Sequence, residues 1–286
     1  MIMDTSYSET GSGDAADRID LSESESGVTL DLGGSGYQTI DEAGNQIRIV
    51  YGDFEQIIGS FYDDVLTGTA ANDHLEGSDG NDVLNGGGGN DNLLGQFGND
   101  TISGGDGDDT LVGDDGDDSI SGGAGNDHLS ENANASFTLT NTSLTGLGND
   151  VLIVEADGSP IESASLVDGD AGHTIDASGY TGNATLIGNG GNDVIRGGSG
   201  NDSIDGGEGY DNLYGNAGND VIVAGTSPAT TGAGHNDTMH GGAGDDRYVF
   251  HDAPGTNEKD YIDEKADEGH DILDFSNLTQ LSLIHI

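Results

Sequence analysis

The chain of 286 residues has no cysteine and no tryptophan, three prolines, and only six lysines and arginines together. Without cysteine, no disulfide can hold the fold. Beside 54 Asp and Glu residues, so few basic residues leave no surface that could neutralise nucleic-acid phosphates or bind an anionic membrane. No apolar run approaches the roughly 18 residues of a membrane span, and the N-terminus lacks the pattern of a secretory signal.

Hydrophobic residues make up 32% of the chain, and the formal net charge is −48. A globular domain has about 45–50% apolar residues, so this chain can bury only a small core. Such a composition, read alone, indicates a chain that stays unfolded without a ligand.

What the sequence does contain is a repeat. Residues 59–130 form eight consecutive nine-residue units, of which Gly104–Val112 is a complete example. Each unit has Gly at the first place and Leu or Ile at the eighth. Each also has Asp at the sixth place: Asp64, Asp73, Asp82, Asp91, Asp100, Asp109, Asp118 and Asp127.

The repeat predicts an all-β fold. Glycine permits the positive φ of a tight turn, and one large aliphatic residue in a short arm indicates a strand with one face inward. Two units then make an 18-residue coil, and coils stack as a right-handed parallel β-solenoid, or β-roll, with β-rich caps. Turns beginning at 59, 77, 95 and 113 would lie on one edge, and those at 68, 86, 104 and 122 on the other.

The stacked carboxylates predict a metal ion. At the strand spacing of about 4.8 Å they repel one another. One inward aliphatic residue contributes roughly 1.5–3 kcal/mol, whereas ordering its nine residues costs about 1–2 kcal/mol each. A cation between successive turns on one edge would offset both deficits. Carboxylate and carbonyl oxygens are hard ligands that suit Ca²⁺, and the lack of Cys argues against zinc.

The unit returns at residue 188, with sixth-place Asp193, Asp202, Asp211 and Asp220, and continues in altered form to Asp237 and Asp246. If each pair of stacked turns shares one site, the two runs together would bind about six to ten Ca²⁺ ions. Further ligands would be glycine carbonyls of the turns: Gly87, Gly89, Gly105, Gly107, Gly123, Gly125, Gly198, Gly200, Gly207 and Gly209.

Five segments are predicted. They are a β-rich N-terminal cap at 1–58, a first roll at 59–130, a less regular segment at 131–187, a second roll at 188–250 and a C-terminal cap at 251–286. The third segment has two interpretations, either metal-free coils that continue the roll or a protruding β-element. The motif Ile19-Asp-Leu-Ser22 recurs at 175–178 and 273–276, so the last segment looks truncated.

The units resemble the G-G-x-G-x-D-x-U-x calcium repeat of RTX (repeats-in-toxin, haemolysin-type) proteins. The best copies are Gly104–Val112 and Gly122–Ser130. The resemblance implies a parallel β-roll with Ca²⁺ between adjacent turns. It also implies an extracellular bacterial protein, exported unfolded by a type I secretion apparatus and folding outside the cell.

The sequence predicts no enzyme. It has neither the H-E-x-x-H motif of zinc proteases nor the G-x-S-x-G motif of lipases. His74, His128, His235 and His240 are interpreted as exposed polar residues. Three roles stay open: a folding and secretion module of a larger protein, a structural or adhesive spacer at a cell surface, and a carbohydrate-binding module. An aromatic or cationic groove on the roll would favour the third.

Overall fold

The computed structural model describes residues 17–34, 36–39, 46–49, 54–154, 160–225, 236–251, 259–264 and 269–277. Within these residues every regular element is a strand, and no helix exists that could cross a membrane. The chain divides into two compact units. Unit 1 comprises Met1–Ser130 and Leu147–Glu162, and unit 2 comprises Glu131–Gly146 and Ser163–Ile286.

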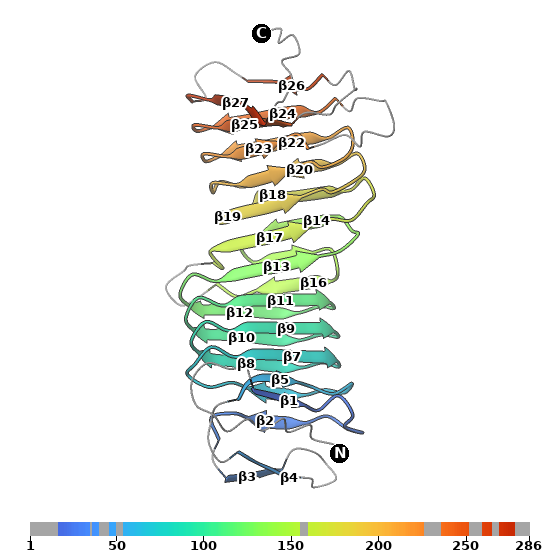
Figure 1. Ribbon diagram of the computed structural model, residues 1–286, viewed down its shortest axis with the longest axis vertical. Coiled ribbons are helices and arrows are strands. Elements are labelled where there is room, and N and C mark those ends of the chain that lie inside the picture. The colour runs from blue at the N-terminus through green and yellow to red at the C-terminus, as the bar shows by residue number, and fades with distance from the viewer. Residues whose placement is uncertain are drawn as a thin grey trace. The chain divides into compact units, whose positions relative to one another are not determined.

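In unit 1 the chain alternates between two parallel sheets, whose strands are stacked as in Figure 1. The first sheet has the order β1 (Asp17–Asp20), β5 (Phe54–Ile58), β7 (His74–Asp79), β9 (Asn92–Phe97), β11 (Thr110–Asp115) and β13 (His128–Asn132). The second has the order β2 (Thr29–Asp31), β6 (Val65–Thr67), β8 (Val83–Gly88), β10 (Thr101–Asp106), β12 (Ser119–Ala124) and β16 (Asn149–Leu152). Strands β3 (Gly36–Thr39) and β4 (Gln46–Ile49) form a separate antiparallel pair.

The strand register shows the 18-residue coil directly. Ile102 of β10 pairs with Leu84 before it and with Ile120 after it, each 18 residues away. The same offset joins Leu93 to Leu111 across β9 and β11. The core of unit 1 is therefore two columns of single aliphatic side chains, one per sheet. The parallel β-roll predicted from the repeat is confirmed.

Unit 2 is built in the same way. Its first sheet has the order β17 (Ser163–Val167), β19 (Asn183–Ile187), β21 (Ser203–Asp205), β23 (Val221–Val223), β25 (Arg247–His251) and β27 (Ile272–Asn277). Its second has the order β15 (Ser143–Thr145), β14 (Phe137–Thr140), β18 (Thr174–Gly179), β20 (Val194–Arg196), β22 (Asn212–Ala217), β24 (Thr238–Ala243) and β26 (Tyr261–Ile262). All the adjacent strands pair in parallel except β14 and β15, which form an antiparallel hairpin.

The irregular segment, of which residues 131–154 and 160–187 are described, contributes strands to these sheets. Strands β17 and β18 take part in the parallel stacking of unit 2, and β16 returns to unit 1, where Leu152 pairs with Ile120. Residues 179–187 form half of a coil, which keeps Gly at the first place and Leu at the eighth but has Ala184 at the sixth. The hairpin β14–β15 is the element that departs from coil geometry.

The recurring Asp-x-Ser motif has the same local structure at all three positions. In each copy the Asp Oδ1 accepts a hydrogen bond from the backbone N–H of the Ser two residues later, at 2.8–3.1 Å. An arginine faces each of these carboxylates, and the pairs are Arg18–Asp20, Arg196–Asp176 and Arg247–Asp274. The longer repeat seen in the sequence is thus also a repeat of structure.

Because one residue per nine-residue repeat fills the core, truncating that residue should strongly lower stability. Leu111 is fully buried. Leu111→Ala is expected to lower the free energy of unfolding by about 2–5 kcal/mol, since the neighbouring coils cannot collapse into the cavity. Chemical denaturation in saturating calcium measures this. The control is Val83→Ala, at a residue that is 40% exposed, and an equal loss for both variants would contradict the prediction.

Candidate metal-binding turns

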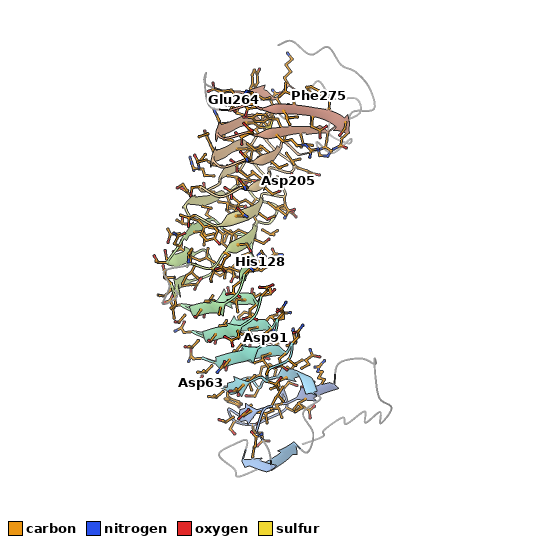
Figure 2. The ribbon with its side chains drawn as sticks, turned by 90° about the vertical axis from the view of Figure 1, so that its left-hand side faces the viewer. Asp63, Asp91, His128, Asp205, Glu264 and Phe275 are labelled. Carbon is orange, nitrogen blue, oxygen red and sulfur yellow. The ribbon has the colours of Figure 1, made fainter. Side chains whose placement is uncertain are left out.

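The fourteen sixth-place Asp residues are all buried, with exposed fractions of 1–4%. They lie in the turns that join one sheet to the other, alternately on the two edges of each roll. Asp63 and Asp91, from turns that begin at 59 and 86, mark the two opposite edges of unit 1 in Figure 2. Unit 1 and unit 2 therefore each have two rows of buried carboxylates.

Within a row the carboxylates form a ladder. The backbone N–H of Asp91 donates to Oδ1 of Asp109, and the N–H of Asp109 donates to Oδ1 of Asp127, at 2.8 and 3.0 Å. In unit 1 the same bond joins Asp64, Asp82, Asp100 and Asp118 in order. In unit 2 it joins Asp193, Asp211 and Asp237 on one edge, and Asp202, Asp220 and Asp246 on the other.

The first-place glycine is explained by the other carboxylate oxygen. Oδ2 of Asp109 lies against Cα of Gly104 so closely that a Cβ there would overlap it. Similar overlaps occur between Asp and first-place Gly throughout both runs. The repeat therefore needs Gly and Asp together, because the side chain of the one occupies the space left by the other.

Eight of these Oδ2 atoms are buried and have no hydrogen-bond partner among the described residues. They belong to Asp82, Asp91, Asp100, Asp109, Asp118, Asp193, Asp211 and Asp220. A buried polar group left unpaired costs about 1–3 kcal/mol, and more when it is charged. Eight such oxygens in register are an arrangement that a bound cation would stabilise.

Burial also makes these carboxyl groups hard to ionise. Desolvation is the main cause, and neighbouring Asp carboxylates add to it, while hydrogen bonds from backbone N–H groups oppose it. The pKa of Asp82 rises to about 8, and those of Asp211 and Asp220 to about 7. For Asp91, Asp100, Asp118, Asp127 and Asp193 the pKa rises to about 6. A cation would favour the ionised form of each.

Fifth-place side chains form a second ladder outside the first. The N–H of Asn90 donates to Oδ1 of Asn72, and the N–H of Asp108 donates to Oδ1 of Asn90. Here the side chain accepts from the following coil, whereas the sixth-place Asp accepts from the preceding one. These fifth-place residues are exposed and bond to the backbone of a neighbouring coil, as turn-forming Asn and Asp residues do.

Four carboxylates outside the predicted set close the ladders. Asp118 donates its N–H to Asp150, and Asp127 donates to Glu162. In unit 2, Asp237 donates to Asp260, and Asp246 donates to Asp271. Asp150 could have been found from the sequence, because Gly148-Asn149-Asp150 keeps the fourth to sixth places of the unit. The other three follow spacings that the repeat does not predict.

The arrangement fits a cation held by few carboxylates and several backbone oxygens. Among the described residues no three His, Asp or Glu side chains converge on one point. A cation would thus take carboxylates singly from successive coils, with carbonyls completing its shell, which suits Ca²⁺. The carbonyls of Gly87, Gly89, Gly105, Gly107, Gly200 and Gly207 each point at a glycine of the next coil. Gly123, Gly125 and Gly209 have positive φ, at 105°, 150° and 156°. The carbonyl of Gly198 accepts the N–H of Ala217.

The histidines do not form a second metal centre in the described residues. His74 and His128 are half-buried rather than exposed, and burial lowers the pKa of His128. His240 stacks on Tyr214 with ring centroids 4.6 Å apart. His235 lies outside the described residues.

Comparison with known proteins agrees with this geometry. A family model described as the RTX calcium-binding nonapeptide repeat matches residues 58–93, 94–129, 178–213, 199–226 and 231–248. No curated protein matches the chain. The match from 178 includes the nine-residue unit at 179–187, in which Ala184 replaces the Asp. Over the matched residues, the chain belongs to the RTX calcium-binding nonapeptide repeat family.

Proposed function

We propose that the chain is a calcium-dependent folding module of a protein secreted by a type I system. Its repeats bind calcium between successive turns, and binding drives the acidic chain into the β-roll. The observation that supports this proposal most strongly is the set of eight buried Oδ2 atoms that lack a partner. Such a structure is unfavourable by itself, so the fold depends on the ion.

The proposed place of action is extracellular. With a formal net charge of −48, the calcium-free chain repels itself and stays extended, which suits passage through a secretion channel. Calcium at the millimolar concentrations found outside cells would then fold it after export, with about six to ten ions bound. The absence of cysteine means that this ion would serve where extracellular proteins often use disulfides.

We propose no catalytic role for the chain. The buried Asp residues repeat without one pair being distinguished from the others, and their oxygens face the backbone of neighbouring turns. An adhesive or structural role in a longer repeat protein is compatible with the same calcium chemistry.

A carbohydrate-binding role has one observation in its favour. On the outer face of β20, β22 and β24, Arg196 lies 5.2 Å from the ring centroid of Tyr214, which stacks on His240. The two rings cover each other, so a sugar would contact mainly their edges. This row favours carbohydrate binding less than an open aromatic face would.

Asp109→Ala tests the shared-site arrangement. The carboxylate of Asp109 lies between those of Asp91 and Asp127 in one ladder, so its removal should weaken calcium binding in three coils together. We expect a calcium titration followed by circular dichroism to shift to higher calcium and to lose cooperativity. Asp106→Ala, which removes an exposed carboxylate two places from Gly104, is the control.

Identical titration curves for Asp109→Ala and the unchanged protein would contradict sharing between coils. Failure of the unchanged protein to bind calcium, measured by equilibrium dialysis, would overturn the proposed function itself.

A further inference from the structure

The repeat turns occur in two conformations, which differ at the second place. In the first, here named the open turn, the second-place residue has a positive φ. In the second, the closed turn, it does not, and its backbone N–H points at the Asp of its own turn. The two conformations leave the buried carboxylate in different states.

All eight turns with a partnerless Oδ2 are open. Their second-place residues are Ser78, Gly87, Gln96, Gly105, Asp114, Asn189, Gly207 and Asn216, with φ from 58° to 117°. Five of the eight are not glycine, and holding such residues at positive φ costs about 1–2 kcal/mol each. The open conformation is therefore kept against a local cost, and it leaves each Asp with a buried oxygen that no donor of the described residues reaches.

Two closed turns satisfy both carboxylate oxygens. Asp202 accepts the N–H of Gly198 on Oδ2, at 2.7 Å, and the N–H of Ala184 on Oδ1, at 2.8 Å. Asp64 accepts the N–H of Ser60 on Oδ2 and the N–H of Val28 on Oδ1. These carboxylates have backbone partners on both sides, so no cation is needed to compensate their burial.

A third closed turn is half-satisfied. Oδ2 of Asp73 accepts the N–H and the hydroxyl of Thr69, while its Oδ1 is buried with no partner in the described residues. It belongs to the closed class by its second place, but it does not have the fully paired carboxylate of Asp64 and Asp202.

The two fully satisfied turns share a position in the ladders. The residue one coil before Asp64 is Val28, and the residue one coil before Asp202 is Ala184, so neither has a carboxylate beneath it. Of the eight open turns whose Oδ2 lacks a partner, seven follow a coil with an Asp at the corresponding place. The eighth, that of Asp193, follows His173, whose ring nitrogen lies 2.8 Å from Asp168.

We propose that only open turns take a calcium ion on their Asp carboxylate, and that Asp64 and Asp202 are structural residues that start a ladder and ligate no ion. This inference rests on the proposed calcium binding and narrows it. For Asp202 this inference differs from the prediction made from the sequence, because Gly197-Gly-Ser-Gly-Asn-Asp202 fits the repeat motif at every place. A closed turn can still contribute main-chain oxygens to the open turn that follows it.

The test compares two Asp residues of one ladder. Asp220→Asn changes an open turn, and Asp202→Asn changes the closed turn one coil before it. Bound calcium per chain is measured at saturation by equilibrium dialysis and elemental analysis, on protein whose β-structure is verified by circular dichroism. We expect Asp220→Asn to bind one ion fewer, or to hold that ion with at least tenfold lower affinity. Asp202→Asn should bind as many ions as the unchanged protein.

Loss of an ion in Asp202→Asn, or no loss in Asp220→Asn, would overturn the inference. The pair Asp64→Asn and Asp82→Asn repeats the comparison in unit 1. If a variant does not fold, a crystal structure of the unchanged protein in calcium, with ions located by anomalous scattering, decides the question. An ion ligated by the carboxylate of Asp64 or Asp202 contradicts the inference, and ions at the open turns alone support it. An unchanged protein that binds no calcium would instead refute the proposed function.

Discussion

Withdrawal of calcium is expected to unfold the chain almost completely. Each coil buries only two aliphatic side chains, and their burial stabilises far less than the ordering of the coil's 18 residues costs. Backbone hydrogen bonds add stability to the calcium-free fold. The eight partnerless carboxylate oxygens and the net charge of −48 destabilise it. Without the ion, the ladder of carboxylates is a source of repulsion inside the fold.

Far-UV circular dichroism and small-angle X-ray scattering measure this transition. In chelator we expect a coil spectrum and a radius of gyration near the ~60 Å of an unfolded chain of this length. Millimolar calcium should restore the β-spectrum and compact the chain. Magnesium is the control, because it demands octahedral geometry and keeps its waters, so it should not replace calcium. A chain that is already β-structured in chelator would show that the core suffices without the ion.

Acid is expected to replace calcium in part. In the fold the pKa of Asp82 is raised to about 8, those of Asp211 and Asp220 to about 7, and that of Asp100 to about 6, from 3.8 in the unfolded chain. A raised pKa means that the protonated form favours folding. This contribution is full below pH ~3.8, and it is lost as the pH rises through about 6 to 8.

For a carboxyl group whose pKa is raised by two, the free energy of unfolding changes by about 2.7 kcal/mol over this pH range. The calcium-free chain should therefore gain β-structure when the pH falls from 8 to about 5. Calcium affinity should fall over the same range, because protons compete for the same oxygens. Circular dichroism of protein dialysed free of calcium, recorded from pH 8 to 4, measures the first effect. A spectrum that stays unfolded throughout would mean that neutralising the carboxylates is not enough to form the roll.

The sequence predicted the repeating part of the fold because each place of the unit has one physical role. The register of Leu84, Ile102 and Ile120 follows from the eighth place, and the burial of Asp109 follows from the sixth. The ladder itself needs no further information, since identical turns stacked in register must place identical side chains together.

The remainder depended on contacts that no nine-residue pattern contains. Glu162 closes its ladder from 35 residues away, and Asp150 from 32, across an inserted hairpin. The difference between Asp202 and Asp220 depends on the coil beneath each, so two sequences that both fit the motif give different turns. Ala184 carries this information, but only once its place in the preceding coil is known.

The path of the chain between the two units limits how the protein can be divided. The chain leaves unit 1 after Ser130, returns at Leu147 and leaves again after Glu162. A fragment that ends at Ser130 lacks β16, whose Leu152 is the partner of Ile120. A fragment that ends at Glu162 carries Phe137 without its partner Ile175 of unit 2. No single cut in the chain yields one intact unit. Duplication or deletion of whole coils in the gene can lengthen or shorten either roll. A single break in the gene cannot transfer one roll alone to another protein.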